Sequence, residues 1–194
     1  MRKTGAIQFF TALLVAWATS PAARADDEAL PAKLRVAVLF KTLTYDHKLE
    51  ANRSNGLKIG VVTLAGNTAS QQEGAAIVEA MRTFGDKKVK GLALSVEPLS
   101  VSSATELEAA VVAKGCNALY LGPNLGDLVD RAVALAKTRS LLVMAGEAEA
   151  VKKGAAIGAV QRGGKPWILV NLKSATAQGA EMDSRLLRFV EVVE

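Results

Sequence analysis

The sequence predicts one three-layer α/β domain in which helices flank a mostly parallel central sheet of Rossmann-like topology. Two observations support this prediction. Short apolar, β-branched runs alternate with segments whose apolar residues recur every three or four positions, which is the pattern of βαβ units. Near the C-terminus, two apolar runs flank the glycines of residues 162–166, and this spacing is typical of an antiparallel hairpin.

The N-terminal half supplies the first helices and strands of this pattern. A helix is expected to open at Leu30-Pro31, because proline suits the first helical turn. Its apolar residues share one face at spacings of three and four: Val36, Leu39, Phe40 and Leu43. Residues 58–64 predict a strand buried on both sides, residues 71–84 a helix, and residues 89–98 contain a second strand.

The C-terminal half continues the alternation and then changes to the hairpin. Asn124 is expected to cap a helix over 125–138, with Asp127 favouring its positive N-terminal end. The remaining predicted elements, in chain order, are a helix over 104–114, strands over 118–121 and 141–145, hairpin strands over 155–161 and 167–172, a short helix after Asn171 and a closing segment over 184–193.

Residues 1–25 have the order of parts of a secretory signal peptide. Arg2 and Lys3 precede an apolar run over 7–18, and small residues at Ala23 and Ala25 fit the peptidase before Asp26. The apolar run is short of the roughly 20 residues that a spanning helix needs. We therefore expect cleavage after Ala25, a mature domain of residues 26–194 in the periplasm, and no membrane insertion of that domain.

The charge of the mature chain gives no reason to expect nucleic acid as a partner. The full chain has a formal charge of +5, which falls to +2 once Arg2, Lys3 and Arg24 leave with the signal peptide. No long basic run or basic-aromatic stripe remains. Binding to nucleic acid is therefore not predicted.

Residues suited to catalysis or metal binding are scarce. His47 is the sole histidine, so no second imidazole can complete a metal site, and we expect it only to stabilise the end of the first helix. Residues 159–166 depart from a phosphate-binding loop at Ala159 and Pro166, and a nucleophile elbow is absent from the sequence. Carboxylates such as Glu73 and Asp127 belong to no paired motif. The sequence thus predicts no enzyme, no catalytic residue, no metal and no cofactor.

Cys116 is the only cysteine, so an intrachain disulfide is impossible. It stands at the mouth of the apolar strand 118–121, and a buried, inert thiol is therefore the favoured interpretation. An intermolecular bridge through Cys116 is the alternative.

Two polar loops at the ends of predicted strands form the default ligand site. Gly66, Asn67, Thr68 and Ser70 lie between a strand and a helix, where backbone N–H groups can meet an anion, and Gly122 and Asn124 hold the equivalent place after strand 118–121. Helix capping by Asn67, Thr68 or Ser70 explains the first loop as well and is the preferred interpretation.

Two side chains in the hairpin region invite a structural interpretation. Asn171 interrupts an apolar strand, and we expect its amide to satisfy backbone groups of the following turn, with a ligand contact as the alternative. Trp167 is expected in the core, where its indole N–H needs a partner.

The order of several short motifs resembles that of the YfiR-like (DUF4154) family of periplasmic proteins along nearly the whole mature chain. These motifs are the helix over 33–43 before strand 58–62, Gly115-Cys-Asn-Ala-Leu-Tyr-Leu, the strand 141–146 with its Gly-Glu, Gly154-Ala-Ala-Ile-Gly, Gly163-Gly164-Lys165, Val170-Asn-Leu, Gly179-Ala and Ser184-Arg-Leu-Leu-Arg. The last block is the most specific.

The resemblance implies a compact α/β domain that acts through another protein and performs no catalysis. The implied partner is the periplasmic part of an inner-membrane diguanylate cyclase or sensor kinase, and the implied effect is restraint of cyclic-di-GMP production. This chain has one cysteine where the family's namesake has paired ones, which argues against redox control of that kind. Its opening helix also lacks the Trp-Pro ending common in the family.

Two questions stay open at the level of sequence. A periplasmic small-solute-binding protein is the alternative function, because the loops at 66–70 and 122–124 could line a ligand crevice. The sequence also allows a homodimer without predicting one.

Overall fold

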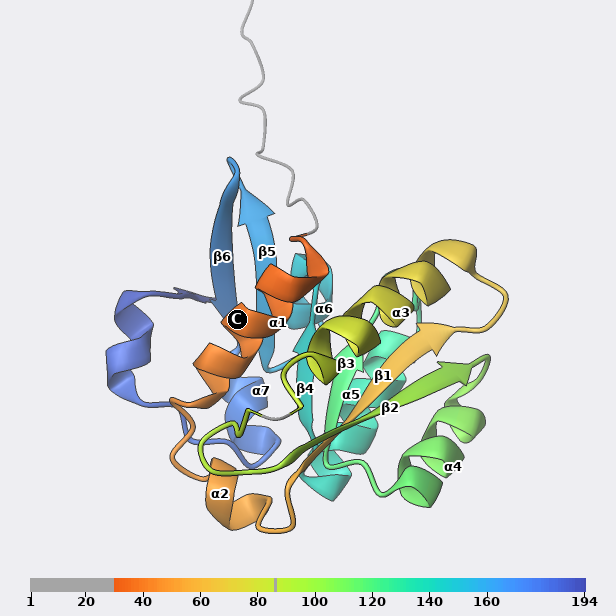
Figure 1. Cartoon of the computed structure of the whole chain (residues 1–194), viewed down its shortest axis with the longest axis horizontal. Coiled ribbons are helices and arrows are strands. Elements are labelled where there is room, and N and C mark those ends of the chain that lie inside the picture. Colours follow the sequence, from red (N-terminus) through yellow and green to blue (C-terminus); the bar gives the residue numbers. More distant parts are fainter. Residues whose placement is uncertain (1–29, 86) are drawn as a thin grey trace, which may run out of the picture.

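A computed structural model describes residues 30–85 and 87–194 and confirms the predicted α/β class. Within those residues one seven-stranded sheet has the order β2-β1-β3-β4-β5-β6-β7. Helices α1 and α3 cover one face of the sheet, and α4, α5 and α6 cover the other (Figure 1). The predicted signal peptide lies outside the described residues.

The strands from β1 to β5 are parallel, and β6 returns antiparallel to β5. The strands are β1 (Leu57–Leu64), β2 (Leu94–Val101), β3 (Ala118–Leu121), β4 (Leu142–Ala145), β5 (Ile157–Arg162), β6 (Lys165–Val170) and β7 (Glu191–Val192). From β1 the chain first adds β2 on one side and then crosses over to add β3 on the other. The strand order therefore reverses between β1 and β3, and such a point is where open α/β sheets bind ligands.

The helices follow the predicted alternation closely in most places. They are α1 (Ala32–Leu43), α2 (Leu49–Asn52), α3 (Thr68–Arg82), α4 (Ala104–Lys114), α5 (Leu128–Arg139), α6 (Ala148–Lys152) and α7 (Leu172–Ala177), followed by the 3₁₀ helix η1 (Ser184–Arg188). The predicted bounds of α4 and β3 agree with the structure. The apolar face predicted for α1 is buried in full.

Two predictions in the middle of the chain are wrong. Helix α5 begins at Leu128, not at residue 125, and Asn124 has a φ of 60°, so it belongs to the turn before the helix and does not cap it. Asp127 occupies the N-cap position without a side-chain cap bond. The second strand runs over Leu94–Val101, whereas residues 89–92 form a small turn closed by the Val89–Leu92 bridge.

Strand β2 lies at one end of the sheet and carries Pro98. The Ala93 carbonyl accepts a hydrogen bond from Leu57 N at the start of β1, and the Val101 carbonyl accepts one from Ala65 N just after its end. The odd-numbered residues of β2 therefore direct their backbone N–H and C=O groups toward β1. Pro98 therefore stands at an outward position, where its missing N–H removes no bond from the sheet. A proline there also discourages another strand from pairing with this edge.

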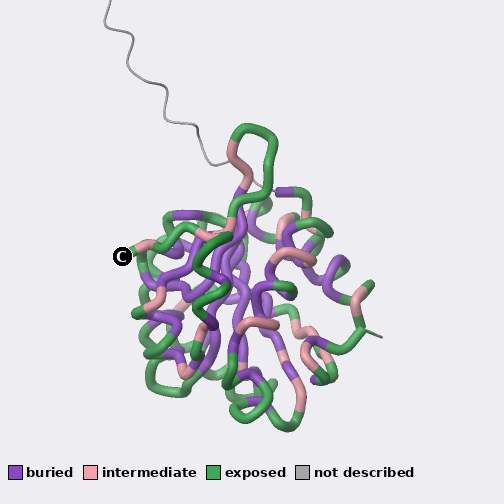
Figure 2. Tube along the Cα trace, turned by 90° about the vertical axis from the view of Figure 1, so that its left-hand side faces the viewer, coloured by how far each residue is buried: buried purple, intermediate pink, exposed green. Residues whose placement is uncertain are grey.

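Two apolar clusters fill the space between the sheet and its helices in the described residues, one beneath α1 and α3 and one beneath α4, α5 and α6. The sheet strands form the buried centre, and the β5–β6 hairpin rises above the rest of the domain with an exposed tip (Figure 2). Gly163 and Gly164 make that two-residue turn, each with a positive φ, as the sequence predicts.

Candidate functional site at the carboxyl edge of the sheet

The structure brings the two predicted loops together at the carboxyl ends of β1 and β3. The Gly122 N–H donates to the Val62 carbonyl, 3.0 Å away, at the end of β1. A Cβ on Gly122 would lie 2.9 Å from that carbonyl oxygen and 3.5 Å from Ser70 Oγ, so this close approach requires glycine. The loops therefore meet at the point where the strand order reverses.

The polar side chains of the first loop already have structural partners. Asn67 Oδ1 accepts a hydrogen bond from Ser70 N at 2.9 Å and thus caps α3. Ser70 is fully buried, and its Oγ accepts from Leu64 N at 3.0 Å. These contacts support the capping interpretation. Of the six residues predicted for the site, Gly66, Thr68 and Asn124 remain exposed at this edge.

A buried cluster around Arg35 lies at the same edge and was not predicted. Arg35 is only 2% exposed and forms an ion pair with Glu73 of α3. Its Nη1 also donates to Tyr120 Oη of β3 and its Nη2 to the Leu30 carbonyl, each at 2.6 Å. Tyr120 Oη donates in turn to Glu73 Oε1 at 3.3 Å. Helix α3, strand β3 and the backbone just before α1 thus converge on one guanidinium.

Gly146 and Glu147 complete this Arg35 cluster at the end of β4. A Cβ on Gly146 would overlap Arg35 Nη1 and lie 2.6 Å from Tyr120 Oη, so the missing side chain leaves space for the guanidinium. Glu147 as a residue is exposed, yet partial burial of its carboxyl raises its pKa, while the Arg35 charge opposes that shift. Burial raises the pKa of Tyr120 to about 12, again against the effect of Arg35.

The contacts of the Arg35 cluster hold α1, α3 and β3 together. Both Arg35 Nη atoms have partners, and only the buried Nε lacks one in the described part of the chain. The hydroxyl of Tyr120 is a proton donor at neutral pH, as an ordinary tyrosine is, and burial moves its pKa further from neutrality. No group of three or more His, Cys, Asp or Glu side chains that could hold a metal ion occurs within residues 30–85 and 87–194.

The sequence contains one signal for Arg35 that periodicity could have found. Arg35 lies four residues before Leu39 and eight before Leu43, so it falls on the face of α1 that packs against the sheet. A charged residue on such a face needs a buried partner of opposite charge. The partner Glu73 comes from another helix, and sequence spacing gives no means of pairing the two.

The other singled-out residues lie away from this edge. Cys116 is buried as predicted, and burial raises the pKa of its thiol. His47 lies beyond the end of α1, where its Nε2 is 3.3 Å from Asp183 Oδ2. Asn171 caps α7 by accepting from Ser174 N and donates to the Val151 carbonyl, which confirms its structural interpretation. Trp167 is 44% exposed, so its prediction as a core residue is wrong.

Trp167 stays at the surface because its ring packs beside Arg162 and its indole N–H donates to Glu191 at 2.9 Å.

In the described residues no helix is both long and apolar enough to cross a membrane.

Comparison with known proteins adds a family and a fold. A family model described as YfiR/HmsC-like (DUF4154) matches residues 32–191. No curated protein matches the chain.

Solved structures of low sequence identity share the fold. The ABC domain from Streptococcus pneumoniae in complex with L-Trp has a TM-score of 0.60 at 13% identity, and the match covers 84% of this chain and 62% of that domain's chain. A conserved domain protein from Vibrio cholerae has a TM-score of 0.61 at 12% identity, and the match covers 86% of this chain and 61% of that protein's chain. A substrate-binding protein with adhesive properties from Clostridium difficile, in its ligand-free, open structure, has a TM-score of 0.53 at 17% identity. That match covers 76% of this chain and 57% of the other chain. This chain therefore spans about three fifths of the length of these structures.

Proposed function

The chain belongs to the YfiR/HmsC-like (DUF4154) family, and on that basis we propose that it is a periplasmic, non-enzymatic regulator that binds the periplasmic part of an inner-membrane diguanylate cyclase and restrains it. A sensor kinase is the second partner class. The family supports a periplasmic regulatory role in general. The match over residues 32–191 is the observation that carries this proposal, because it includes every described strand and helix except the last residue of β7.

The chemistry of the carboxyl edge supports action through contact with another protein. Asn67 and Ser70 are engaged in backbone hydrogen bonds, and Arg35, Glu73 and Tyr120 bond to one another. A catalytic acid or base needs a free group that reaches a substrate. The side chains best placed at this edge are already used to hold the fold together.

Deletion of the gene in the parent bacterium tests the proposal. Loss of a restraining protein should raise cellular cyclic-di-GMP, and expression of the full chain with its own N-terminal segment should lower it again. Tagged protein extracted with the inner membrane should retain a cyclase or a sensor kinase. Unchanged cyclic-di-GMP after deletion, together with no such membrane protein on the tagged chain, would refute the function.

A small-solute-binding protein remains the second candidate, and the observation that favours it is the meeting of the 66–70 and 122–124 loops at the point where the strand order reverses. The similar solved structures include a substrate-binding protein and a domain in complex with L-Trp. A thermal-shift series with amino acids and other metabolites tests it. A saturable rise in melting temperature with one solute supports it, and flat melting temperatures contradict it.

A further inference from the structure

Exposed apolar side chains gather at one end of the sheet. Among the described residues, six large hydrophobic side chains are exposed, and four of them lie between positions 167 and 192: Trp167 at 44%, Leu187 at 41%, Phe189 at 69% and Val192 at 45%. Single exposed apolar residues are common on any surface. Their concentration on β6, on η1 with the residue that follows it, and on β7 is a feature that needs a reason.

A pocket opens beside Phe189, between the end of α1 and the C-terminal segment, whereas Trp167 alternates with the pocket residue Ile168 along β6 and faces the other side of the sheet. We call it the α1–η1 pocket. Its walls are Lys41, Thr42, Tyr45, Ile168, Leu186 and Phe189, and its volume is about 220 Å³. Sites for small ligands usually measure roughly 300–1,000 Å³. The α1–η1 pocket is therefore better matched to one apolar side chain of a protein than to a free solute.

The two helical segments that border the α1–η1 pocket carry basic residues, and Lys41 is the one charged residue among those that line the pocket. Helix α1 and η1 contain no acidic residue. The carboxylates that lie near are engaged elsewhere: Asp183 pairs with Arg185 and His47, Glu181 with Lys48, and Glu191 with Arg162. Lys41 forms a wall of the pocket and Arg188 precedes Phe189, and neither makes an ion pair within the described residues.

Resting on the proposed function, we propose that the α1–η1 pocket is the docking site for the partner, which inserts one apolar side chain from an acidic segment of its periplasmic domain. Apolar anchors in small pockets with charged rims are typical of protein interfaces, where a few such residues carry most of the binding energy. Acidic residues beside the anchor would meet Lys41 and Arg188, which raises the association rate and selects the partner.

Charge also argues against a second copy of this chain as the occupant. In a two-fold symmetric dimer the same surface patch lies on both subunits. Lys41 and Arg188 would then face the same positive patch on the other copy, and such a contact is unfavourable. An anionic lipid surface could meet the charge, but a flat surface does not fill a concave pocket with a side chain.

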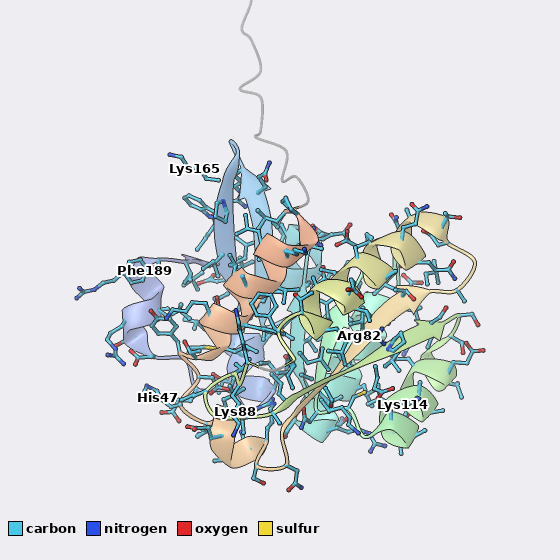
Figure 3. All side chains as sticks on the ribbon, in the orientation of Figure 1. His47, Arg82, Lys88, Lys114, Lys165 and Phe189 are labelled. Carbon is cyan, nitrogen blue, oxygen red and sulfur yellow. The ribbon has the colours of Figure 1, made fainter. Side chains whose placement is uncertain are left out.

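A crosslinking experiment in the parent bacterium tests the occupant. A photoreactive phenylalanine analogue replaces Phe189 in one strain and Val112 in another, and both strains make the full chain. Val112 is 53% exposed on α4, which lies across the molecule from η1 (Figure 3). We expect position 189 to crosslink to an inner-membrane protein whose crosslinked segment is acidic, and position 112 to give no such product. A product with a second copy, or with lipid alone, overturns the proposal.

Point variants of the full chain test the energetics in the deletion strain. Phe189→Ser and Lys41→Glu should each weaken retention of the partner roughly tenfold or more and should return cyclic-di-GMP toward the deletion level. Val112→Ser and Lys137→Glu are the matched controls, since Lys137 is exposed on α5 at the opposite face of the sheet. All four changes are at the surface, so melting temperatures should stay within about 2 °C of the parent.

The outcomes separate this proposal from the function on which it rests. Unchanged cyclic-di-GMP in the deletion strain contradicts the proposed function, and the crosslinking then judges the pocket alone. A clear effect of deletion that Phe189→Ser and Lys41→Glu both complement like the parent chain leaves the function standing and refutes the α1–η1 pocket as its docking site.

Discussion

Replacing Glu73 by leucine should destabilise the domain more than any exposed substitution, because it removes the carboxylate that pairs with buried Arg35. Arg35 is 2% exposed, and the Glu73 side chain is 23% exposed. In Glu73→Leu the guanidinium keeps its bonds to Tyr120 and to the Leu30 carbonyl, but its ion pair is lost and Glu147 is the one carboxylate left whose charge acts on it from a greater distance. An uncompensated buried charge is the expensive result.

The size of the effect follows from the burial of the two partners. Breaking a buried ion pair by removing one member costs about 3–5 kcal/mol. Because water reaches part of Glu73, we expect the lower end, about 3 kcal/mol of unfolding free energy. For a domain of this length that corresponds to a fall in melting temperature of about 6–12 °C.

Urea titration followed by far-ultraviolet circular dichroism is the appropriate assay. Tryptophan fluorescence is a poor choice because Trp167 is already 44% exposed in the folded state. The double variant Arg35→Met, Glu73→Leu is the control, since removing both charges leaves no unpaired ion. We expect it to be more stable than Glu73→Leu alone, while it stays below the parent because the buried Tyr120 hydroxyl and the Leu30 carbonyl lose their partners.

The pairing argument fails if Glu73→Leu costs less than about 1 kcal/mol. It also fails if the double variant is no more stable than Glu73→Leu alone, since the two residues would then act independently.

Three further outcomes follow from buried groups. The pKa of Tyr120 is raised to about 12, against 10 in the unfolded chain, so the neutral hydroxyl favours folding. Its contribution to stability should be complete below pH 10 and should be lost as the pH rises toward 12. In a series of urea titrations at different pH values, Tyr120→Phe should remove this part of the pH dependence. Burial and the raised pKa of Cys116 should slow its reaction with an aromatic disulfide reagent by roughly a hundredfold relative to the chain in urea, and equal rates would contradict the inert-thiol interpretation. Gln178→Leu should lower the unfolding free energy measured by urea titration by about 2–4 kcal/mol, because the buried Val143 N–H and Gly154 carbonyl lose their hydrogen bonds to Gln178. A loss below about 1 kcal/mol would show that these two groups find other partners.

Periodicity predicted most of the fold because burial in this domain follows the chain locally. The α1 face of Val36, Leu39 and Leu43 is fully buried, and the apolar run after Cys116 is β3. The hairpin was predictable for a different reason. Gly163 and Gly164 can adopt the positive φ values that a two-residue turn demands.

The errors in prediction occur where a distant contact outweighs the local pattern. Asn124 is a good capping residue, yet the chain passes through a turn before α5 begins at Leu128. Trp167 is apolar and lies on a strand, but its place near the end of the sheet leaves one side of the ring to Arg162 and Glu191. Neither contact has a fixed spacing in the sequence.

The candidate site divides in the same way. The meeting of the loops at Ser70 and Gly122 was predictable, because carboxyl ends of neighbouring parallel strands share one edge. The Arg35 cluster was not, because Glu73 and Tyr120 approach Arg35 only after α1, α3 and β3 have packed.

Helix α1 connects the carboxyl edge of the sheet with the α1–η1 pocket. Its first turn is fixed by Arg35, whereas its last turn supplies Lys41 and Thr42 to the pocket. Losing the Glu73 contact should therefore disturb docking as well as stability. Gln178→Leu provides the comparison, since Gln178 follows α7 and bonds to β4 and to the loop before β5. If α1 positions the pocket, the Glu73→Leu chain will restrain the partner less than the Gln178→Leu chain, compared under conditions in which both are equally folded. Equal restraint by the two variants would show that the two ends of α1 act separately.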